Sequence, residues 1–247
     1  MNRFFLEPYL ITDERVNFPE AVEHQIISVL RLRSGDVVEV LDNQGCLYRV
    51  SLEVDLEKRS VIGLVMTQEV ASAEPAVKII LCFGMTSRDK VEWILQKGTE
   101  IGVAEFSPFI SSRTLVQSAA ISEKKLVRWE RIIREAAEQS HRGRLPKLNQ
   151  PQDFEACLSS SAAANSLSLI AWEGDDSDQM NIAQSLLGFE GSSIALYVGP
   201  EGGFSNEEIL LAKAFGCRVV TLGDRILRME TAAIVFPVIV LHDLGEL

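Results

Sequence analysis

The chain has 247 residues, hydrophobic residues at 47% of its positions and a net charge of −11. This composition is ordinary for a soluble globular protein with one large domain or two modest ones. The longest apolar stretch, residues 232–241, is too short to span a bilayer and contains Pro237, so we expect a buried helix and no membrane partner. The first ten residues lack the apolar run of a signal peptide.

The four cysteines and three histidines are scattered along the chain, with no CxxC pair. A zinc site needs clustered ligands at short spacing, so no metal site is expected. Buried reduced thiols are typical of a cytoplasmic protein, which is the location that the cysteines predict.

Residues 1 to about 70 alternate short apolar runs with turn residues. The runs 37–41 and 47–52 flank the turn 42–45 and predict a hairpin, and residues 61–65 predict another strand. One helix, beginning after Pro19, carries apolar residues at helical spacing. Short strands with one helix predict a small barrel over residues 1–71.

Small residues and Pro75 make residues 71–75 a linker, after which strands and helices alternate over residues 75–247. Repeated βα units predict a mostly parallel sheet with helices on both faces, an α/β fold. Polar stretches at 159–166 and 173–181 predict loops. We expect strands at 77–82, 106–110, 167–171, 194–198 and 218–222, and helices beginning at Ser87, Ser122, Ser205 and Glu230.

Two glycine-containing turns follow buried-strand patterns, GPEGG at 199–203 and LGDRILRMETA at 222–232. Ligands of open α/β sheets bind at the carboxyl ends of strands, so the two turns predict one pocket. Neither turn is a Walker A or GxGxxG motif, and a phosphate cradle is therefore not expected. The alternative for the first turn is a tight strand-to-helix corner.

The second turn places Ile226 and Leu227 between Arg225 and Arg228. Apolar side chains can hold a flat ring while neighbouring backbone groups bind its edge, as in many adenine pockets. The alternative is a surface ion-pair cluster above a buried plug formed by Ile226 and Leu227.

Charge is distributed unevenly along this acidic chain. Residues 88–147 hold twelve Lys and Arg against eight Asp and Glu. The overall charge argues against a nucleic-acid partner, whereas this basic segment argues for one. A solvated helix face with ordinary ion pairs is the alternative.

The GPEGG and LGDRILRMETA segments resemble the C-terminal signature of the SPOUT methyltransferases. They resemble more closely the RsmE family, bacterial enzymes that methylate uridine N3 in 16S ribosomal RNA. Departures at Gly98, Thr99 and His141 lie outside the cofactor signature. The likeness covers nearly the whole chain and includes, in order, Arg3-Phe4-Phe5, His24 with residues 29–36, residues 90–103, Arg113 and residues 138–146.

The resemblance implies a C-terminal SPOUT-like domain with a trefoil knot, an N-terminal PUA-like RNA-binding barrel and a homodimer. It also implies that S-adenosylmethionine binds in the knot, mainly through backbone groups. The cofactor residues would be Gly199, Pro200, Glu201, Gly202, Gly203, Leu222, Gly223, Ile226, Leu227, Thr231 and Ala232.

In the implied reaction, uridine N3 attacks the sulfonium methyl group, and a nearby charge helps because the N3–H group is only weakly acidic. We expect Arg228 and Arg142 to stabilise the uracil carbonyls or a nearby phosphate, and Glu230 to orient the second turn. The alternatives are phosphate binding alone for the arginines and a helix-dipole role for Glu230. Candidate RNA contacts are His24, Arg31, Arg33, Arg113 and Arg144.

Two other functions remain open on the sequence alone. One is an RNA-binding ribosome-assembly protein with a vestigial pocket, and the other is a SPOUT enzyme that methylates a ribose 2′-hydroxyl or tRNA. Because an acidic protein should bind naked RNA weakly, the expected partner is 16S rRNA within the assembled small subunit.

Overall fold

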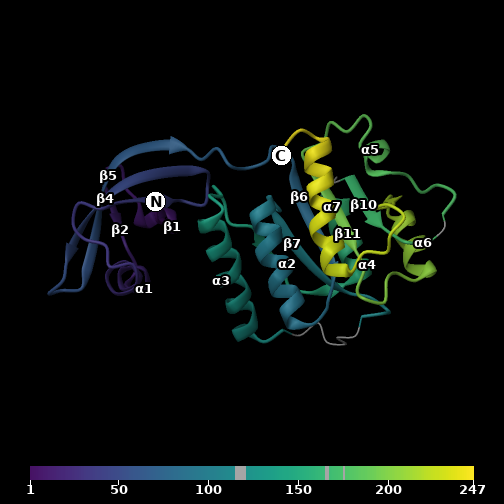
Figure 1. The fold of residues 1–247 in the computed structure, drawn as a ribbon, viewed down its shortest axis with the longest axis horizontal. Coiled ribbons are helices and arrows are strands. Elements are labelled where there is room, and N and C mark those ends of the chain that lie inside the picture. Colours follow the sequence, from purple (N-terminus) through teal and green to yellow (C-terminus); the bar gives the residue numbers. More distant parts are fainter. Residues whose placement is uncertain (115–120, 165–166, 175) are drawn as a thin grey trace. The chain divides into compact units, whose positions relative to one another are not determined.

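The computed structural model describes residues 1–114, 121–164, 167–174 and 176–247, which form two compact units (Figure 1). The first unit comprises Met1–Glu74 and Ala137–Leu145, and the second comprises Pro75–Ala136 and Pro146–Leu247. The sequence indicated the change near residue 75. It gave no sign that residues 137–145 return to the first unit, where Ala137 packs against Phe5, Leu41 and Leu47.

The first unit is built on a five-stranded sheet in the order β1-β3-β4-β5-β2. The predicted hairpin is confirmed as the antiparallel pair β3–β4, and only the β1–β3 pair is parallel. The helix predicted after Pro19 is a short α-helix that continues as one π-helical turn. The elements are β1 (Arg3–Phe5), η1 (Pro8–Leu10), β2 (Arg15–Asn17), α1 (Glu20–His24), η2 (Gln25–Val29), β3 (Val37–Leu41), β4 (Cys46–Asp55) and β5 (Ser60–Val70).

The second unit contains a parallel sheet in the order β12-β10-β11-β6-β7-β8, with β9 also pairing with β7. Every pair of these strands is parallel, which confirms the predicted α/β fold. The strands are β6 (Lys78–Gly84), β7 (Glu105–Ile110), β8 (Lys147–Leu148), β9 (Gln152–Asp153), β10 (Leu167–Ala171), β11 (Ser193–Val198) and β12 (Arg218–Val220).

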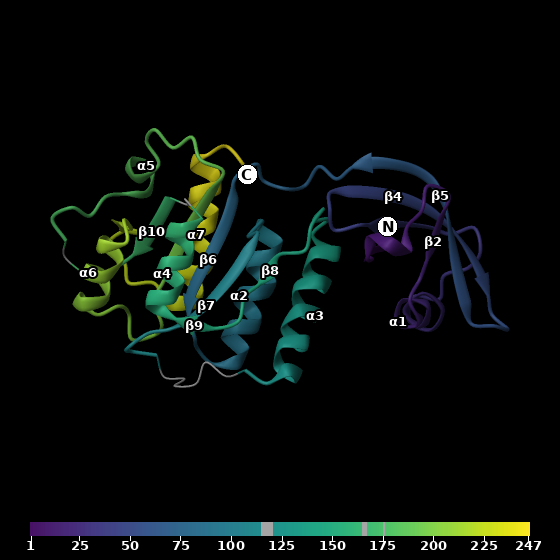
Figure 2. The same cartoon turned by 180° about the vertical axis from the view of Figure 1, so that it is seen from behind.

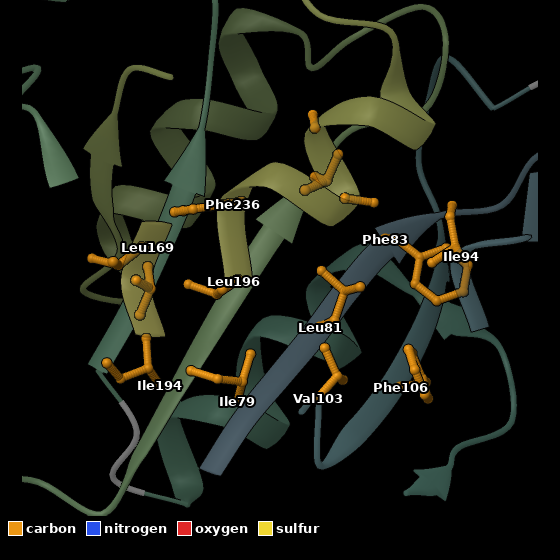
Figure 3. Close-up of a cluster of buried hydrophobic side chains, with 14 of the residues drawn as sticks. Ile79, Leu81, Phe83, Ile94, Val103, Phe106, Leu169, Ile194, Leu196 and Phe236 are labelled. Carbon is orange, nitrogen blue, oxygen red and sulfur yellow. The ribbon is translucent and has the colours of Figure 1, made fainter. Parts of the chain in front are cut away.

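Both faces of this sheet are buried because successive side chains of a strand point to opposite faces. On β6, Leu81 belongs to a core with α2 and α7, whereas Cys82 belongs to a core with α4 and α6. Figure 3 shows the first of these cores, and Figures 1 and 2 show the helices on the two sides. The helices are α2 (Arg88–Ile101), α3 (Glu123–Gln139), α4 (Phe154–Ala163), α5 (Ile182–Ser185), α6 (Asn206–Ala214) and α7 (Met229–Asp243).

Of three predicted helix-end signals, two are confirmed and one is only partly so. Gly102 ends α2 in the left-handed region at φ 117°, and Ser205 forms the predicted capping box with Glu208 at α6. Ser87 lies at the N-cap of α2, but its side chain makes no capping hydrogen bond. The loop predicted at 159–166 is wrong up to residue 163, because α4 extends to Ala163 and buries Ser161. Residues 165–166 of this predicted loop and residue 175 of the second one lie outside the described residues.

The apolar stretch 232–241 lies within α7, as predicted, and α7 packs against α2, β6 and β11. Phe236 and Val240 are fully buried in the core, whereas Val235 and Val238 are half-buried. None of the helices in the described ranges is long and apolar enough to cross a membrane.

Candidate cofactor and active site

A cavity of about 390 Å³ lies at the carboxyl ends of β10, β11 and β12. Its walls come from residues 171–173 after β10, the β11 turn (residues 199–203) and the β12 turn (residues 222–228). The two turns therefore share one pocket, as predicted. Their strands are not adjacent, however, because β10 lies between β11 and β12. A cavity of this size and position suits a small-molecule ligand.

The β11 turn packs closely against the end of β6. A Cβ atom on Gly84 would lie 2.5 Å from the backbone nitrogen of Pro200, so this approach requires glycine. On the other side, Gly203 adopts φ +67°, and a Cβ there would lie 2.4 Å from Glu173 Oε1. Close packing at residue 84 and the left-handed backbone at residue 203 thus fix the course of the turn.

Arg113 supports the β11 turn from outside the cavity lining. Its Nη1 donates hydrogen bonds to the carbonyl oxygens of Gly202 and Phe204 at 3.1 and 3.2 Å. Gly202 approaches Arg113 so closely that an added Cβ would lie 3.0 Å from the arginine Cβ. Arg113 was predicted as an RNA contact, and in the structure its side chain stabilises the β11 turn.

The β12 turn presents apolar side chains to the cavity. Ile226 is 84% exposed, whereas Leu227 packs partly against the core. The alternative of a buried plug formed by both residues is therefore wrong for Ile226, which lies open at the cavity wall. Gly223 takes φ +103° and its N–H donates to Thr221 Oγ1 at 3.1 Å.

An ion-pair cluster joins the two turns through a residue that was not among the predicted site residues. Lys90 Nζ, in the first turn of α2, lies 3.3 Å from Glu201 Oε1 and 3.1 Å from Glu230 Oε2. The Thr86 hydroxyl also donates to Glu201. Glu230 lies in the first turn of α7, where the helix dipole favours a carboxylate.

These contacts keep all three groups of the cluster charged at neutral pH. The Glu230 carboxylate raises the pKa of Lys90 against the effect of burial. Burial works to raise the pKa of Glu201, but the hydrogen bond from Thr86 and the Lys90 ammonium lower that pKa overall. The pKa of Glu230 is likewise lowered, because its backbone N–H and Lys90 outweigh burial.

Most of the residues predicted for the cofactor come together in this cavity. Gly202 and Thr231 do not line it. Arg228 does line it, beside Glu230. The predicted cofactor residues in the lining are Gly199, Pro200, Glu201, Gly203, Leu222, Gly223, Ile226, Leu227 and Ala232.

Arg142, predicted to act with Arg228, belongs to the first unit. It is buried, and its Nε and Nη2 donate to the two oxygens of Glu74 at 2.8 and 2.7 Å. Glu74 also accepts hydrogen bonds from the backbone N–H groups of Gly143 and Arg144. The structure does not bring Arg142 into the cavity lining.

The other predicted RNA contacts also belong to the first unit. His24, Arg31 and Arg33 are exposed, and Arg31 has a positive φ of 56°. Arg144 is exposed as well and donates from Nη2 to the carbonyl oxygen of Gln44 at 2.9 Å.

Sequence reasoning missed the wall formed by Ala171, Trp172 and Glu173. The rule that selected the other two turns could have found it, because these residues also follow a buried strand. Within the described part of the chain, the side chains of Glu173, Arg225 and Arg228 make no hydrogen bond or ion pair, so the lining presents unpaired charges of both signs.

The family model of the RNA methyltransferase domain matches residues 73–240, which include both cavity turns. The chain is 32% identical to ribosomal RNA small subunit methyltransferase E of Bacillus subtilis, over 94% of this chain and 93% of that protein. It is 35% identical to the Synechocystis protein of the same name, over 93% of this chain and 74% of that protein. The chain belongs to the family of the ribosomal RNA small subunit methyltransferase E proteins, which confirms the resemblance.

Solved structures agree with this assignment. The Neisseria gonorrhoeae ribosomal RNA small subunit methyltransferase E, bound to S-adenosyl methionine, has a TM-score of 0.84 at 29% identity, over 98% of this chain and 97% of that one. A putative methyltransferase from Legionella pneumophila, in complex with SAM, has a TM-score of 0.82 at 27% identity, over 97% of this chain and 96% of that one.

Proposed function

We propose that this protein transfers the methyl group of S-adenosylmethionine to uridine N3 of 16S rRNA in the small ribosomal subunit. The observation that carries the proposal is the cavity at the ends of β10, β11 and β12, which gathers nine of the eleven residues predicted for the cofactor. A vestigial pocket would not need to keep both turns intact, so an enzyme is favoured over a binding module. Membership in the family supports rRNA as the substrate class.

The residues present fit S-adenosylmethionine. The exposed Ile226 with Leu222 and Leu227 provides apolar surface for the adenine ring, and the glycines of the β11 turn leave the backbone accessible. When bound, this cofactor supplies a methyl group activated by the sulfonium charge. The unpaired Glu173 and Arg225 are of suitable sign for its ammonium and carboxylate groups.

Arg228 is the residue that we assign to charge stabilisation. Its guanidinium lines the cavity without an ion pair among the described residues, so it can meet the negative charge that develops on the uracil carbonyls as N3 loses its proton. Glu230 acts indirectly, because its ion pair with Lys90 orients the β12 turn. For Arg142, the paired hydrogen bonds to Glu74 favour a structural role in the first unit.

RNA binding by the first unit, as a PUA-like barrel over residues 1–71, is also part of the proposal. The exposed His24, Arg31 and Arg33 support it. Residues 75–247 would form the SPOUT domain with its trefoil knot. The return of α7 from the edge strand β12 to the middle of the sheet, where it packs against β6 and β11, is consistent with that topology.

We further propose a homodimer that buries the outer face of α7. This helix is apolar on nearly every side, yet Val235 and Val238 are only half-buried. Trp93 of α2, the helix packed against α7, is 41% exposed. Val238→Glu should shift the sedimentation coefficient from dimer to monomer, and an unchanged dimer would contradict this interface.

An enzyme that modifies rRNA would work in the cytoplasm.

The decisive experiment is mass mapping of ribosomal RNA from a strain that lacks the gene. We expect one base methyl group to disappear from a uridine of 16S rRNA and to return on complementation. Loss from a ribose or from tRNA would support the other acceptors. Calorimetry with S-adenosylmethionine tests the cofactor separately, and no binding at millimolar concentration would overturn the enzyme assignment.

A further inference from the structure

Three segments far apart in the sequence meet at Lys90. Lys90 comes from the first turn of α2, Glu201 from the β11 turn, and Glu230 from the first turn of α7, directly after the β12 turn. The ammonium lies 3.3 Å from one carboxylate and 3.1 Å from the other. In the part of the chain that the structure describes, no other cation makes an ion pair with either carboxylate.

The two carboxylates are partly withdrawn from solvent. The side chain of Glu230 is 19% exposed and that of Glu201 is 28% exposed, with Lys90 at 33%. Two ionised carboxylates that share a partly buried site repel each other unless a cation lies between them. The other groups that act on them are Thr86, which donates to Glu201, and Arg228, whose charge acts on Glu230 without an ion pair.

We propose that Lys90 is a positioning residue of the cofactor cavity, because its ammonium holds the β11 turn and the β12 turn in register with each other. This inference rests on the proposed function and gives a role to a residue that the sequence analysis did not assign to the site. Without the ammonium, Glu201 and Glu230 would move apart or take up a proton, and the two walls that face the adenosyl group would lose their spacing.

The test is the affinity of Lys90→Met for S-adenosylmethionine and S-adenosylhomocysteine, measured by calorimetry. We expect both affinities to fall on the order of tenfold, because breaking a partly buried charge pair leaves two carboxylates without their cation. Lys97→Met is the matched control. Lys97 lies on the same helix with a similar exposure and pairs with Glu100 at 2.9 Å, but it does not line the cavity.

Two rescues distinguish a charge effect from a packing effect. Lys90→Arg should restore affinity to within about threefold of the wild type, because a guanidinium can bind both carboxylates. The double variant Lys90→Met/Glu230→Gln should bind more tightly than Lys90→Met, because the repulsion has been removed. If Lys90→Met alone does not fold, the double variant and Lys90→Arg are compared with the wild type, and both should bind within about threefold of it.

Equal affinities of Lys90→Met and Lys97→Met would overturn the role of Lys90, and so would failure of both rescues. Failure of the wild-type protein to bind either ligand would instead overturn the proposed function. The two failures are therefore distinguishable in one set of titrations.

Discussion

The arginines of the β12 turn are chemically alike but differ in their neighbours. Arg225 and Arg228 both line the cavity, and Arg228 alone is the N-cap residue of α7 beside Glu230. The backbone of Arg228 is held by α7, because its carbonyl oxygen accepts a hydrogen bond from the Ala232 N–H at 2.8 Å, whereas Arg225 lies on the turn itself. Position, rather than charge alone, should therefore decide which arginine serves the reaction.

We predict that Arg228→Ala lowers turnover about 10²-fold, the usual cost of removing one charge-stabilising donor. The affinity for S-adenosylmethionine, measured by calorimetry, should change little. Arg225→Ala is the comparison in the same turn: it should weaken cofactor binding, because Arg225 is of suitable sign for the cofactor carboxylate, but retain most of the turnover at saturating cofactor. If Arg228→Ala changes neither turnover nor affinity, the assignment of Arg228 is wrong.

The close packing of the β11 turn against β6 can be tested at Gly84. Gly84→Ala places a Cβ against the backbone of Pro200, which no side-chain rotation can relieve. We expect unfolding to become easier by about 1–3 kcal/mol and cofactor affinity to fall, because the β11 turn must shift.

The control for Gly84→Ala is Gly188→Ala, where φ is +73° but no atom lies within 4 Å of the added Cβ. It should show only the strain of the left-handed backbone, about 1 kcal/mol, with unchanged cofactor affinity. Equal losses of affinity in the two variants would contradict the close packing of the β11 turn.

Helix α2 provides Lys90 to the cavity lining and is also joined to α3 by hydrogen-bonded ion pairs. Arg128 of α3 donates from Nε and Nη2 to the two oxygens of Glu92 on α2, at 2.6 and 2.8 Å, and Arg88 donates to the same carboxylate at 2.8 Å. The hydrogen bond from Arg128, with the one from Arg88, lowers the pKa of Glu92 to about 2 against the effect of burial. The helix that carries Lys90 is thus held from two sides.

A lowered folded-state pKa stabilises the protein above the unfolded value of about 4.3 and loses that effect as the pH falls towards 2. We therefore predict that Glu92→Gln lowers the free energy of unfolding at pH 7. The loss should be only about 1 kcal/mol, because Arg88 and Arg128 are exposed and solvent screens their charges. In denaturant titrations, the difference from the wild type should shrink between pH 4.5 and pH 2.

Glu135→Gln is the control for Glu92→Gln, because Glu135 forms one exposed pair with Arg131 on α3. Its effect at pH 7 should stay below about 0.5 kcal/mol. A difference for Glu92→Gln that does not depend on pH would contradict the role of the charge.

The distance along the chain between interacting residues explains which parts of the molecule could be predicted from the sequence. The hairpin β3–β4, five strands of the parallel sheet (β6, β7, β10, β11 and β12), the capping box at Ser205 and the two cavity turns were predictable, because their signals lie within a few neighbouring residues. The short strands β1, β2, β8 and β9, each two or three residues long, were not predicted. The position of β10 between β11 and β12, the bridge at Lys90 and the pairing of Arg142 with Glu74 were not. Each of these depends on which distant segments meet, and the local pattern does not encode strand order.

For the whole molecule, charge is the property that bears on the substrate. The net charge of −11 leaves an excess of basic residues only over 88–147, and several of those are paired within the protein, as Arg128 is with Glu92. Few cations therefore remain to neutralise phosphates and release counterions from RNA, so binding to naked RNA should be weak. A structured ribonucleoprotein can add contacts that do not depend on phosphate charge.

We predict that methyl transfer to isolated small ribosomal subunits exceeds transfer to deproteinised 16S rRNA when radiolabelled cofactor is used at physiological salt. Mature subunits from the deletion strain provide the unmethylated substrate, and wild-type subunits provide the control. Equal rates on naked and assembled rRNA would contradict the preference.

The order in which the cavity walls occur along the chain also bears on folding. Its walls come from residues 171–173, 198–204 and 221–232, and Lys90 contributes from 81 residues before Ala171. No fragment that stops short of α7 contains the whole cavity, so a growing chain acquires it only after α7 has been made. A bound ligand then stabilises only chains in which α7 has folded onto the sheet, by about 2.7 kcal/mol at a concentration one hundred times the Kd. Cellular cofactor would in this way favour chains with a folded α7 and protect them from unfolding and degradation.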